Sequence, residues 1–281
     1  MKVALVHYWL VTMRGGEKVL EELCRLYPQA DIFTHVISEQ NISDTIKAHR
    51  ITTSFIASLP GAARHYQKYL PLMPLALEQL DLRSYDLVIS SESGPAKGVI
   101  TGEETLHLCY CHTPMRYLWA MYHDYRESTG TLTRLTMAPI FHLLRQWDYA
   151  SAARVDHFIA NSTTVQRRIA KTYRRSAEVI HPPVAVDQFA PARSEDFYLL
   201  CGQLVPYKRA DSAVEAFNRM RKPLIVVGTG SELSRLRRMA KPNVKILGAQ
   251  PIESLQRLYA TCRALVARVS PEHSQQLLPV M

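Results

Sequence analysis

The sequence predicts an α/β protein with two domains, each a parallel sheet covered by helices, of which the second is incomplete. Short apolar runs alternate with longer segments of helical period, a pattern typical of parallel sheets with helices on both faces. The alternation stops at a proline-containing segment and then starts again, which indicates a linker between domains. The chain has 281 residues, 47% of them apolar, enough to bury a core in two modest domains.

The first domain is expected at residues 1–185. Its strands are predicted at Val3–His7, Ile32–Val36, Asp86–Ser90, Leu106–Tyr110, His157–Ala160 and Ala177–His181. Its helices are predicted at Glu17–Leu26, Arg64–Leu80, Leu132–Ala153 and Thr164–Tyr173. The apolar start of the chain is a buried strand rather than a secretion signal, because His7 interrupts it and no small-residue cleavage site follows.

A linker at 186–196 leads to the second domain, residues 197–281. Three prolines lie within residues 181–196, which show no helical period. Strands are then predicted at Phe197–Cys201, Leu224–Val227, Val244–Leu247 and Ala264–Ala267, and helices at Arg209–Met220, Glu232–Ala240 and Ile252–Thr261. A full doubly wound sheet often has about six strands, so this domain is expected to be incomplete.

The net charge of +9 and the basic residues of segment 167–175 suit a phosphorylated ligand, an anionic lipid or nucleic acid, although a solvated helix face is the alternative. No helix-turn-helix, zinc-finger or RNP-like pattern accompanies the charge, which argues against nucleic acid. No run reaches the roughly 18 apolar residues that span a bilayer, so a soluble or peripheral protein is expected. Five dispersed cysteines favour reduced thiols in the cytosol.

Glycines follow two of the predicted strands. Gly15 and Gly16 open the first helix, and Gly228 and Gly230 precede a helix of the second domain. A helix N-terminus behind a glycine turn is a good place for a phosphate, but a plain turn explains each pair equally well. Neither turn has the Gly-x-Gly-x-x-Gly spacing, and no acid that would bind a ribose ends the second strand, which argues against a nicotinamide-dependent oxidoreductase.

The loop Gly202-Gln203-Leu204-Val205-Pro206-Tyr207-Lys208-Arg209 ends with two cations at the start of a helix. Cations there oppose the helix dipole, so an anion such as a diphosphate is expected between them and the helix. Two ordinary surface cations are the alternative.

The segment CYCHTPMRYLW, residues 109–119, raises the question of a metal site. Cys109, Cys111 and His112 fall short of the four ligands of a structural zinc site, so the cysteines are expected to be buried and no metal is predicted. His112 falls just past a strand's carboxyl end, where ligands bind in α/β sheets, and is either functional or structural. Arg116 with its aromatic neighbours either lines an acceptor site or packs a short helix, with packing slightly favoured.

Several segments together resemble family 4 retaining glycosyltransferases, over about residues 1–267. They are Gly15-Gly16-Glu17-Lys18, YDLVISS with Ala96-Lys97-Gly98, CYCHTPMRYLW, HPPV and GQLVPYKR. The chain looks most similar to the bacterial mannosyltransferase-like enzymes of O-antigen and exopolysaccharide assembly. The resemblance implies the GT-B fold, two Rossmann-like domains with the active site between them, and a cytoplasmic protein, peripheral at the inner face of the plasma membrane.

The resemblance also implies a reaction: transfer of a sugar, with retention, from a nucleotide-diphospho-sugar to a lipid-linked glycan or polysaccharide. The donor would be GDP-mannose, and no metal or other cofactor would be needed. By position, His112 matches a histidine that contacts the donor sugar, Lys208 the basic residue that holds the diphosphate, and Gly15 and Gly16 the phosphate-side loop. The candidate substrate-binding residues are Gly15, Gly16, Arg116, Gly202, Gln203, Arg209, Gly228 and Gly230.

Two departures from the family pattern stand out. Gln203 replaces an arginine that many members carry. Beyond Ala267 the family's pair of spaced glutamates is missing, since Glu272 has no partner at that spacing. The chain is therefore expected to be a truncated member, and a non-catalytic remnant or binding protein stays an alternative to an active enzyme.

Overall fold

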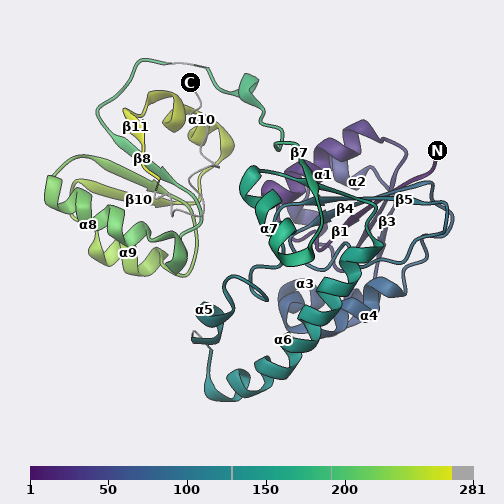
Figure 1. The fold of residues 1–281 in the computed structure, drawn as a ribbon. Coiled ribbons are helices and arrows are strands. Elements are labelled where there is room, and N and C mark those ends of the chain that lie inside the picture. Colours follow the sequence, from purple (N-terminus) through teal and green to yellow (C-terminus); the bar gives the residue numbers. More distant parts are fainter. Residues whose placement is uncertain (128, 191, 268–281) are drawn as a thin grey trace. The chain divides into compact units, whose positions relative to one another are not determined.

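The computed structural model of the protein describes residues 1–127, 129–190 and 192–267 (Figure 1). The chain divides into two compact units, unit 1 at Met1–Pro183 and unit 2 at Val184–Met281, and each is described by itself. The sequence pattern predicted that the first domain ends at residue 185 and that a linker covers 186–196, whereas the two units divide between Pro183 and Val184.

Unit 1 contains a seven-stranded sheet in the order β3-β2-β1-β4-β5-β6-β7, with parallel neighbours throughout. Its strands are β1 Val3–His7, β2 Asp31–Thr34, β3 Ile51–Thr53, β4 Leu87–Glu92, β5 Leu106–Cys111, β6 His157–Ala160 and β7 Ala177–Val179. The predicted parallel α/β class is confirmed. Strand β3 was not predicted, because three residues are too few to show a period of two.

The helices of unit 1 are α1 Gly15–Leu26, α2 Asp44–Lys47, α3 Ala62–His65, α4 Met73–Glu78, α5 Tyr122–Glu127, α6 Thr131–Ser151 and α7 Thr163–Tyr173. Short 3-10 turns lie at Glu39–Asn41, Phe55–Ser58, Tyr66–Leu72 and Ala152–Arg154. The prediction of one helix over Arg64–Leu80 is wrong. Pro71 lies within a 3-10 stretch and Pro74 in the first turn of α4, and proline cannot donate a helical hydrogen bond.

Alternate residues of β1 face two separate cores. Val3 and Leu5 pack with Leu20 of α1, whereas Ala4 and Val6 pack with Leu77 of α4. Figure 1 accordingly shows α1 and α2 on one face of the sheet and α3, α4 and α6 on the other. Because both faces of the sheet are covered, the strands are buried. A ligand can then reach the sheet at the carboxyl ends of its strands.

Unit 2 contains a four-stranded parallel sheet in the order β10-β9-β8-β11 among its described residues. Its strands are β8 Tyr198–Cys201, β9 Leu224–Val227, β10 Val244–Gly248 and β11 Ala264–Leu265, and its helices are α8 Ala210–Met220, α9 Leu233–Met239 and α10 Ile252–Thr261. Short 3-10 turns lie at Val186–Gln188 and Pro206–Lys208. The family resemblance led us to expect a pair of spaced glutamates in this domain, of which the sequence offers only Glu272. Glu272 lies outside the described residues. Within the described part of the chain, no helix is both long and apolar enough to cross a membrane.

Candidate active site

In unit 1 the candidate residue His112 lies at the carboxyl ends of β1, β4 and β5. The sheet register pairs His7, the last residue of β1, with Ser91 of β4. His112 follows β5 directly, and its backbone amide donates to the carbonyl of Glu92, N···O 2.8 Å. Its ring Nε2 lies 2.9 Å from Ser91 Oγ. The strand register therefore places His112 beside the ends of three neighbouring strands, as its position after β5 predicted.

The imidazole of His112 is neutral at physiological pH. Burial disfavours its charged form and lowers its pKa to about 4. The ring of Tyr110 packs against it edge-on, with 5.2 Å between the ring centroids. A neutral imidazole can donate one hydrogen bond and accept another. The role of His112 toward a donor sugar stays a prediction.

The Gly15-Gly16 turn begins α1 above the end of β1, with Arg14 as the N-cap residue. The backbone amide of Arg14 donates to Glu17 Oε2, N···O 3.0 Å. A Cβ on Gly16 would lie 2.4 Å from the hydroxyl oxygen of Tyr8, whereas a Cβ on Gly15 would meet nothing within 4 Å. Packing thus explains the glycine at Gly16, and a role for this helix N-terminus toward a phosphate stays a prediction.

Two buried residues of this site, His7 and Glu17, were not predicted from the sequence. Their side chains are 0% and 2% exposed, and His7 Nε2 lies 4.0 Å from Glu17 Oε1. Burial, with the nearby His112, lowers the pKa of His7 well below its usual value, and burial raises the pKa of Glu17. Among the described residues neither ring nitrogen of His7 has a hydrogen-bond partner. The signal was present in the sequence, because His7 is the polar residue that ends the apolar first strand.

Arg116 lies in the turn that follows His112 and is half-buried. Its carbonyl accepts a hydrogen bond from the amide of Met121, N···O 2.8 Å. The neighbouring Met115 and Leu118 are buried, so this turn is packed from within, the interpretation that the sequence slightly favoured. A role for Arg116 toward the acceptor stays a prediction.

Cys109 and Cys111 are buried in a core cluster with Phe158 and Ile169, as expected. Burial raises the pKa of the Cys111 thiol well above its usual value, which keeps it protonated. No group of three or more potential metal ligands occurs among the residues that the structure describes.

In unit 2 the loops that follow β8 and β9 join backbone to backbone. The amide of Gly202 donates to the carbonyl of Val227, N···O 3.0 Å, and that of Leu204 to Thr229, N···O 2.8 Å. A Cβ on Gly228 would lie 1.8 Å from the carbonyl oxygen of Gly202, and Gly228 has a φ of +141°. Gly230 has a φ of +155°, and its Cβ would lie 2.1 Å from the carbonyl oxygen of Leu204. These glycines are required for the close approach of the two loops, and any contact with substrate would be an additional role.

The two cations of the same loop differ in their surroundings. Arg209 has a φ of +51° just before α8, and its guanidinium donates to Asp211 Oδ1, 3.0 Å, and to Ser212 Oγ, 3.2 Å. An acid within the helix therefore compensates this cation. Lys208 is exposed, and its Nζ lies 3.9 Å from the position of a Cβ on Gly202. Among the described carboxylates none forms an ion pair with Lys208. Gln203 lies half-buried beside Gly202.

The family model described as Glycosyltransferase Family 4 matches residues 13–188, more than half of the 281 residues. The chain belongs to Glycosyltransferase Family 4. The matched range of this family includes Gly15, Gly16, His112 and Arg116, whereas the candidate residues of unit 2 lie beyond it. No curated protein matched the sequence.

Solved glycosyltransferase structures share the fold. A lipopolysaccharide outer core galactosyltransferase, WaaB, in its apo form is 15% identical, with a TM-score of 0.57 over 94% of this chain and 73% of that chain. Anabaena Alr3699/HepE in complex with UDP is 14% identical, with a TM-score of 0.61 over 94% and 73%. Sucrose-phosphate synthase from Thermosynechococcus elongatus is 13% identical, with a TM-score of 0.61 over 95% and 75%. These similarities show the GT-B fold, with two Rossmann-like units, that the sequence predicted.

Proposed function

We propose that this family 4 glycosyltransferase transfers a hexose, with retention, from a nucleotide-diphospho-sugar to a glycan or lipid-linked acceptor. The observation on which the proposal chiefly rests is Lys208 in unit 2, an exposed cation with no carboxylate partner among the described residues, beside a glycine loop at the end of β8. HepE, which has the same fold, has been solved with UDP and with UDP-glucose. That fact supports a nucleotide-sugar as the ligand.

In the proposed reaction the acceptor's hydroxyl oxygen forms a bond to the anomeric carbon, on the same face, as the bond between that carbon and its phosphate oxygen breaks. The electron pair of the broken bond goes to the leaving diphosphate, which gains negative charge and takes up the proton of the acceptor hydroxyl. Lys208 would stabilise that charge, and electrostatic stabilisation of this kind usually contributes more to catalysis than any other single effect. The N-terminus of α1 at Gly15-Gly16 offers amide donors with a partial positive charge. His112, neutral and hydrogen-bonded to Ser91, would hold a sugar hydroxyl. Arg209 contributes less, since Asp211 already pairs with it.

The donor sugar is proposed to be mannose, carried by GDP, from the resemblance to mannosyltransferase-like enzymes. The test is release of the nucleotide by the purified protein with GDP-mannose, UDP-glucose or UDP-galactose. Lys208→Ala should lower kcat/KM at least about tenfold, because a charge-assisted contact contributes roughly 1.5–3 kcal/mol. Lys245→Ala, which removes an exposed lysine of β10, is the control. Unchanged turnover in Lys208→Ala would refute the diphosphate role.

A second candidate is a nucleotide-sugar-binding protein without transferase activity, which Gln203 in place of the family's arginine favours. Measuring both nucleotide binding and nucleotide release distinguishes the two functions. Calorimetric binding of GDP or UDP without release of nucleotide from any donor sugar would support the second candidate.

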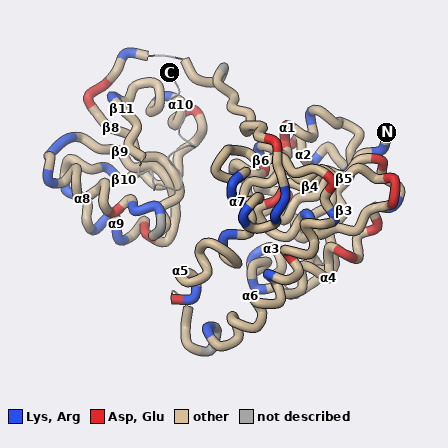
Figure 2. Tube along the Cα trace, viewed as in Figure 1, with Lys and Arg blue, Asp and Glu red and all other residues tan. Residues whose placement is uncertain are grey.

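We further propose that the acceptor is presented at the cytoplasmic face of the membrane and that unit 1 contacts anionic lipid there. Leu135 and Leu143 of α6 are 70% and 64% exposed, and Figure 2 shows basic residues along α7. Exposed apolar side chains favour contact with a membrane surface, and cations elsewhere on the same unit favour anionic lipid. The double variant Leu135→Asp/Leu143→Asp should lose sedimentation with phosphatidylglycerol vesicles, whereas Leu75→Asp, at a 53% exposed leucine of α4, should keep it. Equal sedimentation of both would contradict the membrane contact.

A further inference from the structure

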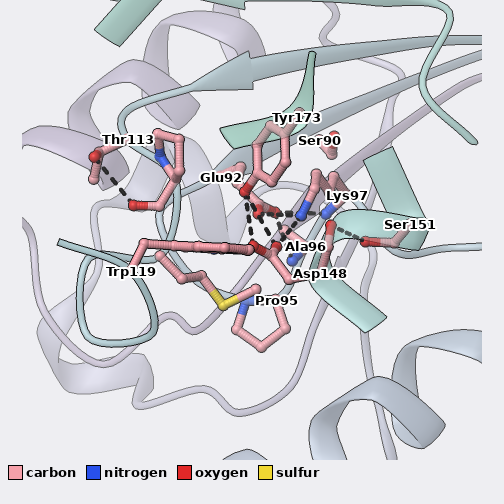
Figure 3. A network of polar contacts seen from close by, with 12 residues as sticks. Ser90, Glu92, Pro95, Ala96, Lys97, Thr113, Trp119, Asp148, Ser151 and Tyr173 are labelled. Atoms are coloured by element: carbon pink, nitrogen blue, oxygen red, sulfur yellow. Dashed lines mark hydrogen bonds and ion pairs between the residues drawn. The ribbon is translucent and has the colours of Figure 1, made fainter. Parts of the chain in front are cut away.

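Unit 1 contains a buried cluster of three charged side chains, Glu92, Lys97 and Asp148, each 0% exposed. Glu92 Oε2 accepts the backbone amides of Ala96, 2.9 Å, and Lys97, 2.7 Å, and Oε1 accepts Lys97 Nζ at 3.0 Å. Lys97 Nζ also donates to Asp148 Oδ1. Figure 3 shows this network.

Asp148 joins segments that are distant in the sequence. It lies on α6 and accepts hydrogen bonds from Trp119 Nε1 at 2.7 Å and from the hydroxyl of Tyr173 at 3.0 Å and 3.1 Å. Trp119 belongs to the turn that follows β5, and Tyr173 is the last residue of α7. The carboxylate of Asp148, on α6, is therefore contacted by three other parts of unit 1. They are the turn after β4, which carries Lys97, the turn after β5 and the end of α7.

Stability alone does not account for this arrangement. Two carboxylates and one ammonium are removed from water, and the resulting desolvation raises the pKa of Glu92. Replacing buried ion pairs by apolar residues is often neutral or stabilising. A buried ionic group of this kind has its best-attested use in specifying one particular register among several.

The segment that carries His112 is fixed at both ends, at one end by the sheet and at the other by this network. At the first end the backbone amide of His112 donates to the backbone carbonyl of Glu92, N···O 2.8 Å, which continues the pairing of β4 with β5. At the other end Trp119 donates to Asp148. We infer that Asp148 and Trp119 are positioning residues, which fix the segment His112–Trp119 so that the His112 ring stays beside Ser91. The inference rests on the proposed function for its effect on turnover, but not for its effect on the position of His112.

The test compares Trp119→Phe with Trp147→Phe. Trp147 lies on α6 and packs against the same cluster of Met115, Leu118 and Leu144 as Trp119 does. Its indole donates to Glu78 Oε1 at 3.0 Å instead of to Asp148, so each variant loses one hydrogen bond from an indole to a carboxylate, and only Trp119→Phe loses the one to Asp148. The two variants should lose similar thermal stability. Only Trp119→Phe should lower kcat about tenfold or more, with the donor KM changed less than twofold.

A second readout, which needs no turnover, is the NMR titration of His112. Its midpoint in the parent protein is expected at about 4. In Trp119→Phe it should rise toward 6.5, because a released ring regains contact with water, and in Trp147→Phe it should not move. An inactive parent with this titration pattern would refute the proposed function and leave the positioning role standing.

Equal titration midpoints for His112 in both variants would overturn the inference, and in an active parent equal kcat values of the two variants would do so as well. If Trp119→Phe does not fold, Asp148→Asn, which keeps the side-chain volume, is the second variant to test. In Asp148→Asn, hydrogen exchange in the peptide 112–121 should be faster than in the parent protein, with exchange in β1 unchanged. Unchanged exchange in both peptides would equally overturn the positioning role.

Discussion

Replacing Lys97 by methionine is the sharpest test of the buried network. Lys97 is 0% exposed, and its ammonium bridges Glu92 and Asp148. Methionine fills a similar volume but supplies no charge and no donor. The substitution therefore leaves two carboxylates buried side by side without a cation, the situation in which desolvation is not offset.

The expected loss follows from the burial. Removing one partner of a buried ion pair costs about 3–5 kcal/mol. Unit 1 spans Met1–Pro183, and in domains of this size each kcal/mol lowers Tm by about 2–4 °C. Lys97→Met should therefore melt roughly 6–20 °C below the parent. Without the cation the buried carboxyls favour their protonated form in the folded state, so the deficit should be largest at pH 7 and smaller at pH 5.

The assay is thermal unfolding followed by tryptophan fluorescence, since Trp9, Trp119 and Trp147 all lie in unit 1. Lys68→Met, at an exposed lysine, should change Tm by no more than about 2 °C, because surface substitutions usually stay within about 0.5 kcal/mol. Adding Glu92→Gln to Lys97→Met removes one unpaired charge and should restore part of the loss. Melting of Lys97→Met within about 2 °C of the parent would refute the reasoning about buried charge.

Three other predictions use steric and titration properties of the chain. Gly16→Ala places a Cβ 2.4 Å from a tyrosine hydroxyl oxygen and should destabilise unit 1 by about 1–3 kcal/mol in urea unfolding, whereas Gly15→Ala should be neutral; equal effects would contradict the packing argument. Gly228→Ala meets a backbone oxygen at 1.8 Å and should lower the circular-dichroism melting transition of unit 2, while an unchanged transition would exclude the close approach of its loops. Burial lowers the pKa of His35 and His107 to about 4. The stability that each neutral ring contributes above pH 6.5, about 3 kcal/mol, should therefore be lost as the pH falls from 6.5 through 4. A urea unfolding midpoint that stays constant from pH 7 to 4 would contradict their burial as neutral rings.

Strand positions and most helix positions follow from local patterns. The predicted strands Val3–His7, His157–Ala160 and Leu224–Val227 match β1, β6 and β9, because a short apolar run between turn residues has few other structures open to it. His112 was predicted at a strand's carboxyl end for the same local reason. Pro71 and Pro74 also indicate that the segment 64–80 is not one continuous helix. The helical period of its apolar residues nevertheless led to the prediction of a single helix.

Arg209 illustrates a contact that local pattern left open. Its position at a helix start suggested a bound anion, yet the structure shows its guanidinium on Asp211, two residues further along. Charge at a helix end predicts that a counter-charge is needed, but only the folded backbone decides whether a ligand or a neighbour supplies it. Lys208, one residue earlier, keeps its charge unpaired among the described residues.

By itself the sequence determined the parallel α/β class, the turns that follow each strand and the place of His112, since these depend on periodicity and on neighbours in the chain. The tertiary structure alone decided that Lys97 meets Asp148 and that Trp119 reaches the same carboxylate. In the sequence these side chains look like ordinary surface charges and one more aromatic residue. Their partners lie 51 and 29 residues away, and such pairing arises only when the sheet brings α6 and the turns after β4 and β5 together, away from water.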